Sequence, residues 1–182
     1  METLILPLGD LAKCAENDSE QSERLSSLLS SFAPSHEDSG EKAFLSHKAL
    51  AFERLSKART FLVMLDGQFA GFFSLAIKTL ELCGLSKTMR KKLMAGDSMN
   101  ENTSAFLIGH LARSINSPKG FGARLLDLAM EYIGQARQIV GGRLAYLDCK
   151  DNSKLRAYYE NKGFSFLQKS PNTELLQYYM VL

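Results

Sequence analysis

The clearest pattern of apolar and polar positions runs from residue 105 to residue 166. Residues 105–112 form an almost unbroken apolar run, which is typical of a buried strand. From Gly120 onward the apolar residues recur at steps of three and four, which predicts a helix with one buried face. Residues 143–149 predict a second strand. Because a helix connects these two strands, we expect them to lie parallel.

The pattern continues to the end of the chain with one more helix and two strands. Asp151, Asn152 or Ser153 can cap the helix, and Gly163 suits its C-terminal end. Residues 164–168 and 175–182 then predict strands that pair as a hairpin.

The N-terminal half predicts a strand at 3–8, with Pro7 placing its end at a sheet edge, and helices at 19–32 and 41–58. Strands are expected at 60–65 and 69–80. Asp66-Gly67 between them is a strong hairpin signal, because both residue types tolerate a positive φ. The fold class is therefore α/β, with a mixed central sheet and helices on both faces.

Residues 82–103 form a long connection between two strands and hold a short helix at about 86–95. Its positive charges are Lys87, Arg90, Lys91 and Lys92. We favour a solvated helix face for them. The alternative is a lip that attracts an acidic substrate such as RNA, but the absence of interleaved aromatic residues weighs against nucleic acid.

Composition narrows the class of protein. A chain of 182 residues with 45% hydrophobic content predicts one domain, 1–182, with a substantial core. The net charge of +2 gives no general case for nucleic acid. Three widely spaced cysteines argue for a reducing compartment. With no secretory signal and no membrane-spanning run, the expected location is the cytoplasm, with no membrane partner.

The turn at residues 118–122 has the chemistry of an anion site. Gly120 and Gly122 let the backbone curl and let a ligand approach it. The amides of residues 119–124 should then point outward from a helix N-terminus, where a pyrophosphate fits. The spacing matches neither a Walker loop nor a full GxGxxG fingerprint.

The turn and the following segments resemble the GNAT superfamily of acyl-CoA-dependent N-acetyltransferases. The superfamily's pyrophosphate loop, Q/R-x-x-G-x-G/A, matches residues 117–122, and its signature ending in Y-x-x-x-G-F matches residues 152–164. Two departures stand out: Ser117 replaces Gln or Arg, and Ala157 is displaced from the usual alanine position. The resemblance is close over about a third of the chain. It implies a GNAT-like central sheet that is mixed and mainly antiparallel, with one splayed parallel pair. It also marks residues 82–103 as a basic helical insertion, because members of the superfamily usually join these two strands more briefly.

The resemblance implies acetyl-CoA as acyl donor and a set of cofactor contacts. One amide of the strand at 105–112, for which we take Ala112, should face the oxyanion. The implied cofactor-binding residues are Leu111, Ala112, Arg113, Ser117, Lys119, Gly120, Phe121, Gly122, Ala123, Asn152 and Tyr159.

Tyr159 is the predicted general acid. A phenol with a reference pKa of about 10 stays protonated at neutral pH and can donate to a thiolate with a reference pKa of about 8.5. The alternative is that Tyr159 only packs, as we expect for Tyr158. The fixed distance from Tyr159 to Gly163-Phe164 favours catalysis.

The general base stays open. His110 is a candidate because its reference pKa lies near neutrality, although a lone histidine on an apolar strand is more often a core residue. Asp148 is an alternative base, and Glu41 or Glu53 are further ones. No metal site is expected, and Cys149 has no paired histidine for a covalent route.

The predicted function is transfer of an acetyl group from acetyl-CoA to a primary amine by direct attack in a ternary complex. The alternatives are a non-catalytic CoA-binding regulatory module, a nucleotide-binding protein that uses the same turn, and a tRNA-acetylating toxin of the same superfamily. A homodimer is compatible with the architecture.

Overall fold

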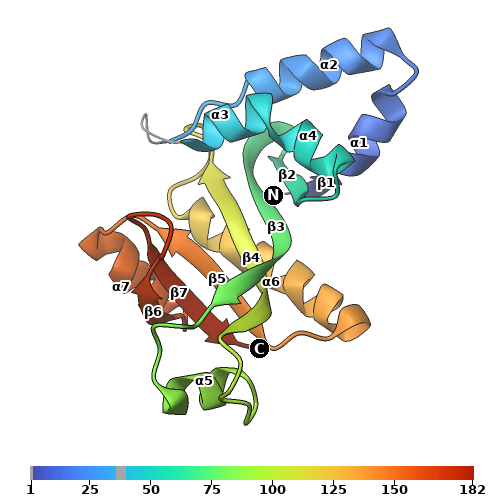
Figure 1. The fold of residues 1–182 in the computed structure, drawn as a ribbon. Coiled ribbons are helices and arrows are strands. Elements are labelled where there is room, and N and C mark those ends of the chain that lie inside the picture. Colours follow the sequence, from blue (N-terminus) through green and yellow to red (C-terminus); the bar gives the residue numbers. More distant parts are fainter. Residues whose placement is uncertain (1, 36–39) are drawn as a thin grey trace. The chain divides into compact units, whose positions relative to one another are not determined.

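The computed structural model describes residues 2–35 and 40–182, which form a seven-stranded sheet in the order β1-β2-β3-β4-β5-β7-β6. The strands are β1 (Thr3–Pro7), β2 (Arg59–Leu65), β3 (Gln68–Glu81), β4 (Asn102–Arg113), β5 (Leu144–Cys149), β6 (Ser165–Lys169) and β7 (Leu176–Val181). The helices are α1 (Leu8–Ala15), α2 (Ser19–Ser30), α3 (Gly40–His47), α4 (Ala49–Arg54), α5 (Lys87–Leu93), α6 (Phe121–Val140) and α7 (Ser153–Asn161). Figure 1 labels them along the chain.

The sheet is mixed, as the sequence predicts. The pairs β1–β2, β2–β3, β5–β7 and β6–β7 are antiparallel, and the pair β4–β5 is parallel. The crossover helix between the parallel strands is α6. The α/β class with one parallel pair is thus confirmed.

The chain divides into two compact units. The first comprises Met1–Ala76 and His110–Glu131, and the second comprises Ile77–Gly109 and Tyr132–Leu182. Three elements, β3, β4 and α6, contribute residues to both. The single domain expected from the sequence stays a prediction.

In the first unit, the meander β1–β2–β3 packs with the first four helices. The hairpin signal is confirmed, because Asp66 and Gly67 both have positive φ values, 48° and 80°. β1 lies at the sheet edge, as Pro7 predicts. The core of this unit consists of Leu8, Leu25, Leu29, Phe32, Phe44, Leu45, Ala49, Leu62, Phe72 and Ala112.

Two helical predictions in this unit were wrong in detail. The predicted helix 41–58 is broken into α3 and α4 at Lys48, whose φ and ψ of −121° and −31° leave the helical region. The helix α1 was missed, because it follows Pro7 directly, has no side-chain cap and is only eight residues long. Between α2 and α3 the polar residues 33–40 predict a loop, and residues 36–39 of it lie outside the described residues.

In the second unit, β5, β7 and β6 form antiparallel ladders, and α7 contacts β6 (Figure 1). The parallel pairs run from Phe106↔Ala145 to Ile108↔Leu147. Gly142 allows the Phe106 ring to lie close to the backbone just before β5, because a Cβ on Gly142 would lie 2.5 Å from Cε2 of Phe106. Within residues 2–35 and 40–182, no helix is both long enough and apolar enough to cross a membrane.

The insertion at 82–103 folds around α5, close to the predicted helix at 86–95. Ser86 caps the helix, with its Oγ accepting a hydrogen bond from the Met89 amide at 3.2 Å. The insertion is closed at its base by a bond from the Leu82 amide to the Glu101 carbonyl, 2.7 Å. Leu93 is 1% exposed and belongs to the core of the second unit, so the insertion is packed onto the fold.

Candidate functional site

The glycine turn at the start of α6 has fewer open amides than the sequence suggests. Gly120 has a φ of +86°, as expected for a turn that needs glycine. The Phe121 amide donates to the Pro118 carbonyl at 3.1 Å, and the Ala123 amide donates to the Gly120 carbonyl at 3.0 Å. Within the turn, no hydrogen bond joins the amides of Lys119, Gly120 and Gly122 to another described residue.

Gly122 leaves space that no protein atom fills. A Cβ at this position would have no described heavy atom within 4 Å, and the φ of Gly122 is not positive. Neither backbone strain nor protein packing in the first unit therefore accounts for glycine here. The absence of a side chain keeps the open amides accessible to a ligand.

Ser117 is a turn residue in this structure. The residue is 8% exposed, and its Oγ donates to the Ser114 carbonyl at 2.7 Å. Its amide donates to the same carbonyl at 3.1 Å. Since the hydroxyl proton is already used inside the turn, the expectation that this side chain contacts the cofactor loses support.

The end of β4 is held by β3 within the first unit. The His110 amide donates to Ser74 Oγ at 3.0 Å, and the Ser114 amide donates to the Ala70 carbonyl at 2.7 Å. Between them, the Ala112 carbonyl oxygen lies 2.7 Å from where a Gly71 Cβ would be. Residues 110, 112 and 114 thus direct their backbone groups towards β3, as alternation along a strand requires.

This alternation favours a different amide for the oxyanion. The Ala112 amide points towards β3, so the neighbouring amides, those of Leu111 and Arg113, point away from it. The Arg113 carbonyl accepts a hydrogen bond from the Ser35 amide at 3.1 Å, so the chain at 33–35 flanks the strand there. Leu111 is therefore a better candidate than Ala112 for the amide donor.

His110 lies flat against Phe44 of α3. The two ring centroids are 3.8 Å apart and the rings are tilted by only 16°. Burial lowers the pKa of His110; Glu41 opposes this effect by favouring the charged ring, and Lys48 adds to it. The imidazole is thus mainly neutral at pH 7 and can accept a proton.

Asp148 belongs to a polar chain in the second unit. It lies opposite Gln177 on β7 and accepts a side-chain hydrogen bond from it. Gln168 Nε2 donates to Gln177 Oε1 at 2.9 Å and to the Glu81 carbonyl at 2.7 Å. Desolvation on the strand raises the pKa of Asp148 despite the Gln177 bond. These contacts give Asp148 a structural role.

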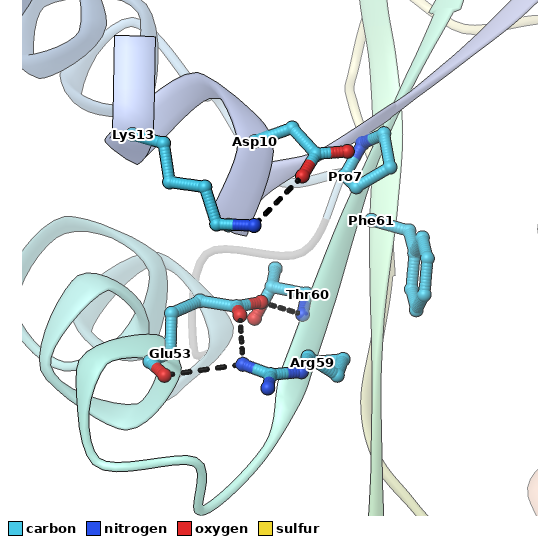
Figure 2. A pocket seen from close by; sticks show the side chains of 8 residues that line it. Pro7, Asp10, Lys13, Glu53, Arg59, Thr60 and Phe61 are labelled. Atoms are coloured by element: carbon cyan, nitrogen blue, oxygen red, sulfur yellow. Dashed lines mark hydrogen bonds and ion pairs between the residues drawn. The ribbon is translucent and has the colours of Figure 1, made fainter. Parts of the chain in front are cut away.

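Glu53, one of the alternative bases, is a buried ion-pair partner. Its side chain is 3% exposed, and its Oε2 lies 2.8 Å from Arg59 Nη1. Its Oε1 accepts a short hydrogen bond from the Thr60 amide. Figure 2 shows this pair facing the exposed pair of Asp10 and Lys13 across a small pocket of about 170 Å³. The carboxylate ties α4 to β2.

Tyr159 is fixed by the turn that ends α7. Gly163 has a φ of +88°, and the Phe164 amide donates to the Tyr159 carbonyl at 3.0 Å. The Tyr159 ring lies 6.1 Å from that of Phe164, 6.2 Å from that of Tyr178 and 5.1 Å from that of Tyr158, between centroids. The spacing to Gly163-Phe164 noted in the sequence thus has a structural cause.

Asn152 is the N-cap of α7. Its Oδ1 accepts a hydrogen bond from the Lys154 amide at 2.8 Å, which settles the choice among the three predicted caps. The same side chain retains its NH₂ group as a donor.

The structure thus groups the predicted residues by unit. The glycine turn, Leu111–Arg113 and His110 belong to the first unit, and Asp148, Asn152 and Tyr159 belong to the second. Sequence inspection missed Phe44, Gly71 and Ser74. Of these, only Gly71 gave a signal, because an isolated glycine in a strand often marks a close backbone approach.

Two other kinds of site, a nucleophilic cysteine and a metal centre, have little support among the described residues. Cys149 is buried, and burial raises the pKa of its thiol, which makes it a poor nucleophile. No three His, Cys, Asp or Glu side chains among residues 2–35 and 40–182 gather closely enough to hold a metal ion.

Comparison with known proteins gives matches among solved structures. No family model and no curated protein matches this chain. A structure of AtaT complexed with acetyl-methionyl-tRNAfMet matches with a TM-score of 0.69 and 21% identity, over 99% of this chain and 95% of that one.

Two further structures show the same fold. One is an AtaT mutant toxin, with tyrosine replaced by phenylalanine, bound to acetyl-CoA and to the C-terminus of the antitoxin AtaR; its TM-score is 0.65 at 17% identity, over 100% of this chain and 94% of that one. The other is a tyrosine-to-phenylalanine mutant of KacT, with a TM-score of 0.68 at 20% identity, over 98% of this chain and 95% of that one. The chain therefore has the GNAT-like fold of these proteins.

Proposed function

We propose that this protein is an acetyl-CoA-dependent N-acetyltransferase that acetylates the amino group of an aminoacyl-tRNA and acts as a toxin. The observation that supports this most is the fold match along nearly the whole chain to AtaT, whose structure holds acetyl-methionyl-tRNAfMet. The sequence alone did not favour nucleic acid. The match reverses that preference and makes a tRNA-borne amine the first acceptor to test.

The glycine turn would bind the pyrophosphate of acetyl-CoA. Three amides, those of Lys119, Gly120 and Gly122, are available there, and the N-terminus of α6 adds roughly half a positive charge. The Leu111 backbone and the Asn152 NH₂ group would bond the pantetheine arm. Lys119 is exposed and supplies a further positive charge near the phosphates.

The chemistry is attack of an uncharged amine on a thioester. The nitrogen forms a bond to the carbonyl carbon, and the Leu111 amide stabilises the negative oxygen. Collapse of this intermediate breaks the carbon–sulfur bond, and Tyr159 donates its phenolic proton to the departing thiolate. Re-protonation of the phenolate from solvent completes the cycle.

His110 would accept the proton that the amine loses, directly or through a water. Its neutral ring at pH 7 meets the first requirement of a base. Asp148 is a weaker candidate, because its carboxylate is engaged by Gln177 in the polar chain.

The experiment combines the purified protein, acetyl-CoA and aminoacylated tRNA, with N-acetyl-aminoacyl-tRNA detected by mass spectrometry and thiol release followed in parallel. Tyr159→Phe should lower kcat by about 10² or more without weakening acetyl-CoA binding, because proton donation by a side chain typically contributes 10²–10⁴. Tyr158→Phe, on the next residue of α7, is the matched control. Equal rates for wild type and Tyr159→Phe would exclude Tyr159 as the acid.

The competing functions predict other outcomes. Binding of acetyl-CoA with no turnover on tRNA or on a panel of small amines would favour a CoA-binding regulatory module, for which the internally bonded Ser117 hydroxyl is the supporting observation. Turnover on small amines alone would favour an ordinary amine acceptor. Stabilisation by ATP or NAD in place of acetyl-CoA would indicate a nucleotide-binding protein.

Growth of cells that express the protein gives an independent test. Expression of the wild type should stop growth, and Tyr159→Phe should restore it. Normal growth with the wild type, at a level of protein confirmed by blotting, would contradict the toxin part of the proposal.

A further inference from the structure

The backbone of β4 between His110 and Ser114 is fixed at both ends by one short stretch of β3. At one end, the acceptor for the His110 amide is a side chain, Ser74 Oγ, at 3.0 Å. At the other end, the Ser114 amide bonds to the Ala70 carbonyl at 2.7 Å. Both partners lie in the first unit.

Between these two hydrogen bonds, Gly71 allows β3 to lie close to β4. A Cβ on Gly71 would lie 2.7 Å from the Ala112 carbonyl oxygen, 2.7 Å from Leu125 Cδ1 and 3.2 Å from Arg113 Cα. A contact under 3.0 Å requires an atom to move, and of the two contacts under 3.0 Å the one with the Ala112 carbonyl oxygen is with backbone. The strand is thus pressed against β3 in the middle and hydrogen-bonded to it on both sides.

Ser74 can influence the direction of the Leu111 amide through the His110 amide that it holds. It is 2% exposed, so its hydroxyl has no bulk water to compete for the His110 amide. The Leu111 amide is the next one along the strand and points to the opposite side. Any rotation of the His110 peptide therefore changes the direction of the Leu111 amide.

We infer that Ser74 is a positioning residue for acyl transfer: by holding the His110 amide, its hydroxyl aims the Leu111 amide at the oxyanion. This inference rests on the proposed function, which assigns Leu111 as the donor. Ser74 itself touches neither substrate nor cofactor in this scheme. Its effect should fall on the chemical step, because the oxyanion exists only after the amine has attacked.

The test is a kinetic comparison of three variants with the wild type on acetyl-CoA and aminoacyl-tRNA. Ser74→Ala removes the acceptor and should lower kcat by about tenfold to a hundredfold, the scale of an ångström-sized misplacement. The KM for acetyl-CoA should stay within about twofold of the wild-type value, because Ser74 makes no contact with the bound ground state of acetyl-CoA in this scheme. Ser74→Thr retains the hydroxyl and should recover most of the lost kcat.

Thr60→Val is the matched control. Thr60 is the direct cross-strand neighbour of Ser74 on β2, it is also buried, and its hydroxyl has no partner among the described residues. Its removal should leave kcat within about twofold of the wild type. An equal loss in Thr60→Val and Ser74→Ala would show a general packing effect and overturn the inference.

Amide hydrogen exchange supplies a readout that does not need turnover. In Ser74→Ala, the amide of His110 should exchange faster and the Leu111 amide resonance should shift, whereas Thr60→Val should leave both unchanged. Unchanged amides, or an unchanged kcat, would overturn the inference. If the wild type shows no turnover, the proposed function fails, and the exchange data still decide whether Ser74 holds this part of β4. If Ser74→Ala does not fold, Ser74→Cys, with its weaker acceptor, takes its place.

Discussion

The glycine turn at residues 118–122 and the insertion at 82–103 both suggest anion binding in the sequence, but the structure leaves the donors of the turn open and engages half of the charges of the insertion. In the turn, three backbone amides stay without a partner among the described residues. In the insertion, two of the four positive charges are already engaged. Arg90 is 11% exposed and lies 3.0 Å from Glu101, and Lys92 Nζ donates to the Tyr179 hydroxyl at 3.4 Å.

The insertion has a mainly structural role. Leu85, Met89, Leu93 and Met94 pack with the core of the second unit. The C-terminal carbonyls of α5 are also capped, since Arg143 donates to the Leu93 carbonyl at 3.1 Å and to the Lys92 carbonyl at 3.3 Å. A count of basic residues therefore overstates the charge that a ligand meets, whereas a backbone turn keeps its donors because the helix cannot use them.

The largest expected effect concerns the packing of the insertion. Leu93→Ala should destabilise the protein by about 2–5 kcal/mol, because it leaves a cavity at a fully buried position. Chemical denaturation of wild type and variant measures this difference. Leu55→Ala is the control: Leu55 is 63% exposed, and its loss should cost no more than about 0.5 kcal/mol. A loss below about 1 kcal/mol for Leu93→Ala would contradict a structural insertion.

The next effect concerns the turn. Gly122→Val should weaken acetyl-CoA binding by about tenfold or more, because a branched side chain would cover the amides that we assign to the pyrophosphate. Calorimetric titration measures the affinity. The thermal stability should change little, since a Cβ at Gly122 meets no described protein atom within 4 Å.

Gly134→Val is the matched control for the turn. Gly134 lies in the same helix, and a Cβ there also has nothing within 4 Å. Both variants should share the small helix-propensity effect, and only Gly122→Val should lose affinity. An equal affinity in both variants would remove the turn from the cofactor site.

A smaller effect is expected for the free charges of the insertion. The double variant Lys87→Glu, Lys91→Glu should change the KM for aminoacyl-tRNA by less than about threefold at physiological salt, because two exposed lysines on a short helix add little to a phosphate contact. The salt dependence of KM checks this. If the slope of log KM against log salt changes by about one unit per lysine, the insertion binds RNA and the contrast with the turn is lost.

The smallest effect concerns Asp148. The raised pKa of Asp148 means that the folded protein binds the carboxyl proton more tightly than the unfolded chain does. The free energy of unfolding therefore falls as pH rises through the pKa range of carboxyl groups and Asp148 ionises. Asp148→Asn should therefore gain stability over the wild type at neutral pH and lose that advantage in acid. Melting temperatures of the wild type and the variant between about pH 4 and pH 8, a range that begins near the reference pKa of a carboxyl group, measure this difference in stability. The acetylation rate should be unchanged, and a large loss would restore Asp148 as a candidate base.

The sequence predicted the order of elements well and the local breaks poorly. Asp66-Gly67, Asn152 and Gly163 each occupy the backbone conformation that their residue type prefers, so the hairpin and both ends of α7 were predictable. The break at Lys48 and the short helix α1 were not, because no residue type signals them. The cytoplasmic location and the homodimer stay predictions.

By itself, the sequence determined where the chain turns and which faces are apolar, because glycine conformation and hydrophobic period are properties of neighbouring residues. The candidate cofactor turn followed from that, and the GNAT-like fold followed from the resemblance of residues 117–122 and 152–164 to motifs of that superfamily. Only the tertiary structure decided which donors are already used: the hydroxyl of Ser117, the amide of His110 and the charges of Arg90 and Lys92. Their partners, from Ser114 to Tyr179, lie at sequence separations that range from three residues to 87, and a hydrogen bond depends on distance in space and not on order along the chain.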